Sequence, residues 1–141
     1  MNFTNKILLV GLGDMSQKYA AVLSHLNVDF TPVGRGEVSA KSFSDSTGIT
    51  AVLGGLERFI FSFKGTIASH AIVCLPVDAL YKETLRLIKF GVKNILVEKP
   101  AGLTNAQIND IANHASEFGC NVFTAYNRRF FSSVVELQKR I

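Results

Sequence analysis

The chain has 141 residues, 48% of them hydrophobic, and a formal net charge of +4. This length fits one domain, and this apolar content suffices for a packed core. The 15 basic residues are scattered, with no run longer than Arg128-Arg129, which argues against a nucleic-acid-binding protein. The longest apolar run, Ala71 to Val77, is too short to span a membrane, and no signal-peptide core precedes Gly11, so we expect a cytoplasmic protein.

The first elements follow the order strand, glycine turn, helix. Lys6 to Val10 predicts a buried strand, and Gly11-Leu12-Gly13 predicts a tight turn. In a nucleotide-binding βαβ unit, Gly11 permits the turn and Gly13 lets a pyrophosphate approach the helix N-terminus. Ser16 stands where the G-x-G-x-x-G pattern has its third glycine, and an ordinary turn is the alternative interpretation. The predicted helix has an apolar stripe of Met15, Tyr19, Val22, Leu23 and Leu26.

The second predicted strand, Val28 to Val33, is followed by Gly34-Arg35. In NAD-binding sheets an acidic residue about 20 positions after the glycines binds the ribose 2′-hydroxyl, and here that position holds Gly34-Arg35. Arg35 offers a planar, fixed charge that suits a phosphate. The sequence therefore favours NADP as cofactor, with NAD as the alternative and with Ser39 and Lys41 as helpers. The other interpretation of Arg35 is a surface loop residue.

The middle of the chain is less regular. Residues 36 to 48 are rich in Ser, Gly, Lys and Asp and predict a loop with at most one short turn, and Ile49 to Leu53 predicts a third strand. Leu56 to Phe63 fits both a helix and an alternating strand, and we favour the helix because Gly54-Gly55 and Gly65 bound it. In that helix Phe61 points away from the main stripe. We expect it to fill the core rather than to cover a neighbour or form a subunit contact.

Strands and helices alternate regularly in the second half of the chain. The expected strands are His70 to Leu75, Asn94 to Glu98 and Asn121 to Ala125. The expected helices are Val77 to Phe90, a helix from the capping box Thr104/Gln107 to Phe118, and Ser132 to Ile141. Their apolar faces are Val77, Leu80, Tyr81, Leu85 and Ile88 for the first, and Ile108, Ile111, Ala112, Ala115 and Phe118 for the second.

The alternation as a whole predicts an α/β fold, a Rossmann-type doubly wound, mostly parallel sheet with helices on both faces. Ligands bind such sheets at the carboxyl ends of the strands. Cys74 and Cys120 are expected in strands as small buried residues, and no metal-ligand spacing is present. The segments expected along the carboxyl edge are Gly11 to Ser16, Gly34-Arg35, Leu75-Pro76, Glu98-Lys99-Pro100 and Tyr126-Asn127.

Glu98-Lys99-Pro100 directly follows a predicted buried strand. A cation at Lys99 can steady ribose hydroxyls, a carboxamide or a substrate oxyanion, and it can transfer a proton if burial depresses its pKa. The alternative is a Glu–Lys pair that caps the strand.

Several motifs together carry a resemblance. These motifs are, in chain order, G-x-G-x-x-S, Leu75-Pro76, Val97 to Thr104 and Ala125 to Phe130. With them the chain resembles, over essentially its whole length, the N-terminal domain of the glucose–fructose oxidoreductase / inositol dehydrogenase / MocA family. The resemblance implies a dinucleotide-binding domain over residues 1–126. It implies that residues 127–141 begin a connection to a C-terminal substrate domain absent from this chain. The implied activity is NAD(P)-dependent hydride transfer on a sugar, cyclitol or similar hydroxyl substrate.

The resemblance also implies residue roles. Lys99 is the catalytic lysine, Glu98 supports it, and Pro100 is a cis-proline. Lys99, Asn127 and Arg128 border the substrate cleft. Pro76-Val77 and Leu80 depart from the family's Pro-Asn and His, which weakens the ribose contacts. The cofactor-binding residues are Gly11, Gly13, Asp14, Met15, Ser16, Gly34, Arg35, Leu75, Pro76, Glu98, Lys99 and Asn127.

Three functional classes stay open at this point. An oxidoreductase with only Lys99 of its catalytic residues in these 141 residues is expected to turn over weakly or not at all. A non-catalytic NAD(P)-binding module or a truncated remnant that needs a partner is the second class. A methyltransferase is third, because it does not explain Glu98-Lys99-Pro100. Apolar Phe130, Phe131 and Val134-Val135-Leu137 predict a partner surface, because the absence of a second domain would leave them uncovered. A homo-oligomer is among the expected partners.

Overall fold

The structure, a computed structural model, describes residues 7–64 and 68–140. In these ranges six parallel strands form one sheet in the order β3-β2-β1-β4-β5-β6, which confirms the predicted doubly wound fold. The strand order reverses between the neighbours β1 and β4, where ligands bind sheets of this kind. The strands are β1 (Ile7–Val10), β2 (Phe30–Gly34), β3 (Val52–Leu53), β4 (His70–Val73), β5 (Asn94–Val97) and β6 (Asn121–Thr124).

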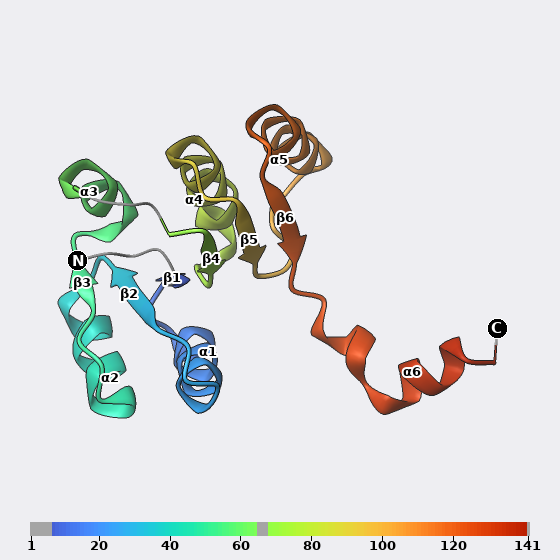
Figure 1. The fold of residues 1–141 in the computed structure, drawn as a ribbon, viewed down its shortest axis with the longest axis horizontal. Helices are drawn as coiled ribbons and strands as arrows, with labels where there is room; N and C mark the ends of the chain where they lie inside the picture. The colour runs from blue at the N-terminus through green and yellow to red at the C-terminus, as the bar shows by residue number, and fades with distance from the viewer. Residues whose placement is uncertain (1–6, 65–67, 141) are drawn as a thin grey trace.

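Helices cover both faces of the sheet (Figure 1). On one face lie α1 (Asp14–His25) and α2 (Glu37–Thr47), and on the other lie α3 (Gly55–Ser62), α4 (Val77–Phe90) and α5 (Asn105–Phe118). The short helix η1 (Asn127–Phe130) and α6 (Ser132–Gln138) follow β6 and project away from the sheet. The arrangement places the N-termini of the crossover helices along the edge where the strands end.

The two faces of the sheet carry separate apolar cores. Leu8 and Val10 of β1 pack in the cluster that includes α3, α4 and α5. Leu9, between them in the chain, packs with Ala20 and Phe43 in the cluster under α1 and α2. Successive strand side chains point to opposite faces, so a strand covered on both sides is apolar throughout.

Helix α1 is confirmed, but its predicted buried stripe is partly wrong. The buried side chains are Ser16, Ala20 and Leu23. Small residues at positions 16 and 20 let α1 lie close to the sheet, and this packing turns larger side chains outward. Exposed members of the predicted stripe are Met15, Val22 and Leu26.

Helix α2 contradicts the loop predicted for residues 36 to 48. Its single buried side chain, Phe43, is fully buried against the sheet and α1. The helix ends at Gly48, in the left-handed conformation, and the hydroxyl of Thr47 donates to the carbonyl of Phe43. Of its three apolar residues, Val38, Ala40 and Phe43, only Phe43 is buried, and three such positions give no clear period. The helix therefore depends on tertiary packing rather than on a pattern.

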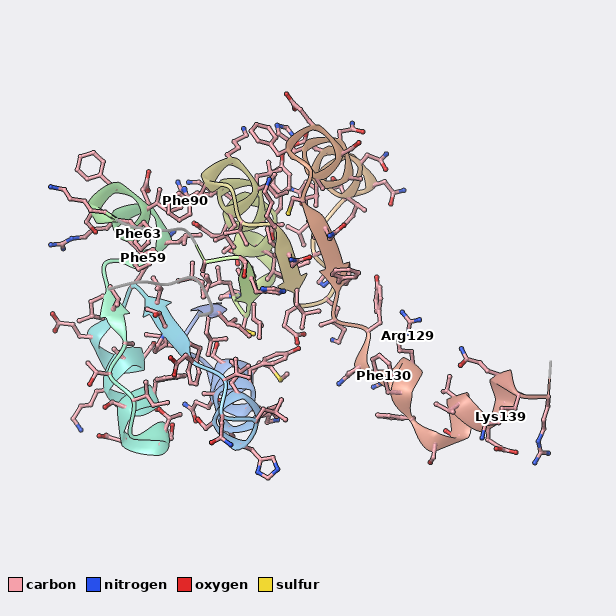
Figure 2. All side chains as sticks on the ribbon, in the orientation of Figure 1. Phe59, Phe63, Phe90, Arg129, Phe130 and Lys139 are labelled. Atoms are coloured by element: carbon pink, nitrogen blue, oxygen red, sulfur yellow. The ribbon has the colours of Figure 1, made fainter. Side chains whose placement is uncertain are left out.

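Helix α3 confirms the helical interpretation of Leu56 to Phe63. Its inner side joins an aromatic group in which Phe59 and Phe63 have centroids 5.4 Å apart and Phe63 and Phe90 5.7 Å apart (Figure 2). Phe61 is 93% exposed, so the expectation that it fills the core is wrong. On an eight-residue helix, position 61 falls opposite the stripe that faces the sheet. The predicted boundary residue Gly65 lies outside the described residues, as do Lys6 and Ile141.

The remaining predictions differ from the structure mostly in detail. The bounds of α4 match, and Thr104 caps α5 by accepting from the amide of Gln107. Strand β3 has only two residues. Strands β4, β5 and β6 end one or two residues before their predicted ends, and β2 starts two residues later and ends one residue later than predicted. Cys74 and Cys120 are buried and free, at positions just after β4 and just before β6. Predicted inward residues that are instead exposed are Val77, Ile108, Ala112 and Phe118.

The C-terminal segment exposes apolar side chains, as the sequence suggested. Phe130 is 76% exposed and Leu137 is 57% exposed, while Val134 is half-buried. The guanidinium of Arg129 lies 5.6 Å from the ring centroid of Phe130, and both lie away from the sheet (Figure 2). Within residues 7–64 and 68–140, no helix has the length and apolar character needed to cross a membrane.

Candidate functional site

A cavity of about 530 Å³ opens at the carboxyl ends of β1, β2 and β4, at the reversal of strand order. Its volume lies within the range of small-molecule sites. The turns after these three strands are far apart in the sequence, and the parallel sheet brings them to one edge. Six of the predicted cofactor-binding residues line it: Gly11, Gly13, Gly34, Arg35, Leu75 and Pro76.

The glycine turn has two distinct roles in this cavity. Gly11 has φ +115°, and a Cβ there would overlap the carbonyl oxygen of Cys74, so only glycine fits. Gly13 has an ordinary φ of −83°, and a Cβ there would meet nothing within 4 Å. The space beside Gly13 is therefore open for a ligand rather than filled by the protein.

The N-terminus of α1 begins at Gly13, and no side chain caps it. The amide groups of the first helical turn have no partner within the helix, and the helix dipole adds partial positive charge there. An uncapped helix N-terminus beside an open glycine is suited to a pyrophosphate. These residues thus fit the diphosphate of a dinucleotide.

Ser16, at the place of the third glycine, is fully buried and does not line the cavity. It lies between α1 and the sheet, where a small residue permits close packing.

Cys74 lines the cavity as a protonated thiol. Burial, followed by the charge of Glu98, raises the pKa of Cys74 to about 12. The thiol therefore keeps its proton at neutral pH and is not a nucleophile.

Arg35 extends from the end of β2 across the cavity wall. Its Cγ lies 2.7 Å from the place a Cβ would take on Gly55, which has φ +78°. Its Nη2 donates to Oε1 of Glu83 across 3.1 Å. Of the two predicted helpers, Ser39 lines the cavity, whereas Lys41 pairs with Asp45 at 3.0 Å and does not.

Glu83 is the residue at this site that sequence reasoning missed. It lies on α4, lines the cavity and is buried. The sequence did contain a signal, since a carboxylate falls on the stripe that also buries Leu80 and Leu87. A carboxylate on the buried face of a helix is costly unless a cation pairs with it, so its position predicts a cationic partner. Gly55 and Asp78 also line the cavity and were not predicted to do so.

The second motif lies outside the cavity. Glu98 is half-buried, and its Oε1 accepts a hydrogen bond from the Tyr19 hydroxyl across 3.1 Å. Burial, followed by the charge of Glu98, raises the pKa of Tyr19, so the phenol stays protonated. Lys99 is exposed, and the Lys99–Pro100 bond is cis, as the resemblance implied. Among the described residues no ion pair joins Glu98 to Lys99.

The other predicted residues are not gathered around the cavity. Asp14 lines a separate hollow formed by α1 and the last residues of α2. Lys99, Asn127 and Arg128 are exposed and follow β5 and β6, farther along the same edge of the sheet. The structure thus assembles the glycine turn with Arg35, and leaves the predicted catalytic and substrate residues on an open surface. The predicted residues that do not line the cavity are Asp14, Met15, Ser16, Glu98, Lys99, Asn127 and Arg128.

Solved dehydrogenase structures share this fold. The WlbA dehydrogenase of Chromobacterium violaceum, solved with NADH and UDP-GlcNAcA, matches 99% of the chain with a TM-score of 0.82 and 16% identity. A probable dehydrogenase of Thermotoga maritima matches 95% with a TM-score of 0.81 and 18% identity. A putative myo-inositol dehydrogenase of Sinorhizobium meliloti matches 96% with a TM-score of 0.77 and 19% identity.

The chain spans 40% of the length of each of these three proteins. No protein-family model matches the sequence, and no curated protein matches it. Identities below 20% establish a shared fold and leave the activity to be argued from the site.

Proposed function

We propose that this chain is the dinucleotide-binding domain of an NAD(P)-dependent oxidoreductase of the glucose–fructose oxidoreductase / inositol dehydrogenase / MocA family. The observation that carries the proposal is one cavity that combines the open Gly13, the uncapped N-terminus of α1 and the cation of Arg35. These features suit a diphosphate and an adenosine ribose at the strand-order reversal. The fold shared with dehydrogenases, one of them solved with NADH and a UDP-sugar, supports it.

Each part of the cavity has a proposed role. Gly13 and the first turn of α1, including Asp14, Met15 and Ser16, hold the pyrophosphate through backbone amides. Arg35 and Ser39 lie beside the adenosine ribose, and Leu75-Pro76 lie beside the other end of the dinucleotide. When bound, the nicotinamide supplies a hydride acceptor or donor for a carbinol carbon.

The chemical step is assigned to residues farther along the edge. Lys99 is the proposed catalytic residue, which orients a substrate hydroxyl or holds its proton, with Glu98 behind it. Asn127 and Arg128 border the substrate, a sugar, cyclitol or similar hydroxyl compound. Residues 1–126 form the nucleotide domain, and residues 127–141 begin the connection to a substrate domain. Because Lys99 is exposed, these residues alone give weak turnover.

A second candidate is a non-catalytic NAD(P)-binding module. The observation in its favour is that Lys99, Asn127 and Arg128 lie outside the cavity on exposed surface. Both candidates bind the dinucleotide, so turnover separates them. NADP-linked oxidation of a sugar or cyclitol that is lost in K99M supports the enzyme, and binding without turnover across such substrates supports the module.

The cofactor preference proposed is NADP over NAD, because Arg35 replaces the acid that would bind a ribose 2′-hydroxyl. Replacing Arg35 with Asp is expected to reverse the ratio of the two dissociation constants. An unchanged ratio in R35D would remove Arg35 from cofactor selection.

The first experiment is thermal unfolding of the chain with NADPH, NADH or S-adenosylmethionine at millimolar concentration. A ligand of the folded state stabilises it by about 2.7 kcal/mol at 100 times its dissociation constant. G13A is the test variant, because its Cβ enters open space and its φ suits alanine. We expect G13A to fold and to lose the shift with both nicotinamide nucleotides. No shift of the wild type with either one contradicts the proposal, and a shift with S-adenosylmethionine alone points to a methyltransferase-type site.

A further inference from the structure

A buried carboxylate lies in the wall of the cavity. The side chain of Glu83 is 3% exposed, and no part of the mechanism proposed above uses it. A buried carboxylate is costly unless cations and hydrogen-bond donors surround it. Its partners therefore indicate what it does.

Two arginines share Glu83. Nη1 of Arg86, on the same helix, donates to both carboxylate oxygens at 2.9 Å, and Nη2 of Arg35 donates to Oε1 at 3.1 Å. The formal charge of this group of three is +1. Glu57 also pairs with Arg86 at 3.2 Å, but its side chain is 75% exposed, so water screens its charge. Positive charge is thus left over on the Arg35 side, which faces the cavity.

Arg35 is held at two points along its length. Its side chain is 72% exposed, so without contacts it would sample many rotamers. The stem instead crosses Gly55, where a Cβ would lie 3.2 Å from its Nε, and the guanidinium ends on Glu83. A guanidinium has five N–H donors, so the bond to Glu83 leaves others for a ligand.

We infer that Glu83, together with Arg86, is a positioning residue that holds the Arg35 guanidinium at the cavity for a phosphate monoester on the adenosine ribose. This inference rests on the proposed nicotinamide dinucleotide site. Fixing Arg35 beforehand removes an entropic cost of binding, and guanidinium geometry favours two parallel bonds to a phosphate. Glu83 acts through Arg35 and does not touch the phosphate itself.

The test is calorimetric titration of NADPH and NADH into wild type, E83Q, R35A, R35A/E83Q and the control E57Q. We expect E83Q to raise the dissociation constant for NADPH about tenfold, equivalent to about 1.4 kcal/mol, and that for NADH less than twofold. E57Q should change neither. In the R35A background, E83Q should have no further effect on NADPH, because the residue through which it acts is gone.

Other outcomes overturn the inference. If E83Q binds NADPH and NADH more weakly by the same factor, Glu83 has a merely structural role. If only the binding of NADH is weakened, Glu83 accepts a hydrogen bond from a ribose hydroxyl. If circular dichroism shows that E83Q is unfolded, E83D replaces it, because it keeps the charge and shortens the reach to Arg35. The preference for NADPH, which is the dissociation constant for NADH divided by that for NADPH, is then expected to fall in E83D. A wild type that binds neither nucleotide overturns the proposed function along with this inference, whereas normal binding with an unchanged ratio in E83Q or E83D overturns this inference alone.

Discussion

The hydroxyl of Tyr19 donates to Oε1 of Glu98 across 3.1 Å, and this bond ties α1 to the carboxyl end of β5. Tyr19 lies in the second turn of the helix that begins the glycine-turn site. Glu98 directly precedes Lys99, the residue proposed for catalysis. The contact therefore couples the positions of the cofactor end and the chemical end of the sheet edge.

Replacing Tyr19 with Phe removes this bond and keeps the ring. Because the acceptor is a carboxylate, we expect the free energy of unfolding to fall by about 1.5–3 kcal/mol. Urea denaturation measures it, and Y126F is the control, since Tyr126 is 59% exposed and its variant should stay within about 0.5 kcal/mol. A Y19F chain as stable as wild type would show that the bond contributes nothing to the fold.

Cys74 makes stability depend on pH in the alkaline range. Its pKa is about 12 in the folded chain against an ordinary 9.0, so on raising the pH the unfolded chain loses the thiol proton first. The free energy of unfolding should therefore fall above about pH 9 and continue to fall towards pH 12. In this window the wild type should lose about 1.4 kcal/mol per pH unit more than C74A. Urea denaturation between pH 8 and pH 10.5 measures the two slopes, and equal slopes would contradict the buried-thiol assignment.

Gly55 and Gly48 form a matched pair that isolates the Arg35 contact. Both have positive φ, +78° and +73°, so alanine at either costs about 1–2 kcal/mol of backbone strain. At Gly55 the new Cβ also lies 2.7 Å from Cγ of Arg35, whereas at Gly48 it meets nothing within 4 Å. G55A should therefore weaken NADPH binding, and G48A should not, at similar thermal stability. Equal affinities for NADPH in the two variants would show that the position of Arg35 does not affect nucleotide binding.

Phe43 and Val38 test whether α2 depends on one buried side chain. Phe43 is fully buried and Val38 is 85% exposed on the same helix. F43A should lower the free energy of unfolding by about 3–5 kcal/mol, through lost burial and a cavity under α2. V38A should be within about 0.5 kcal/mol of wild type, because the site is exposed and alanine favours helix. A small loss in F43A would mean that α2 is held by its backbone and polar contacts.

The parts of the fold that were predictable are those with local signals. Helix α4 combines a 3.6-residue apolar period with Pro76 before it and Gly91 after it, and its bounds match the prediction. Gly91 takes the left-handed conformation that ends helices. The central strand β1 is apolar on both faces, which indicates a sheet covered on both sides. Such signals act within one element, so they need no knowledge of its neighbours.

The sequence predictions that the structure contradicts fall where tertiary packing overrides local signals. Residues 37 to 47 are mostly polar, and the burial of Phe43 is decided only by the sheet that lies beneath it. On α1 the apolar residues Met15 and Val22 are exposed, because a close approach to the sheet selects the small residues Ser16 and Ala20 for its buried side. Phe61 stays exposed because α3 is short and presents its other side to the sheet.

The sequence by itself determined the order of the strands and of the helices other than α2, and with it the edge at which the glycine turn and Arg35 meet. That follows because parallel connections between successive strands place every strand end on one side. Only the tertiary structure decided the partners at that edge. Arg35 pairs with Glu83 48 positions away, and Tyr19 pairs with Glu98 79 positions away. No periodicity or turn signal reaches across such separations, because these pairs form only when packed layers bring distant elements together.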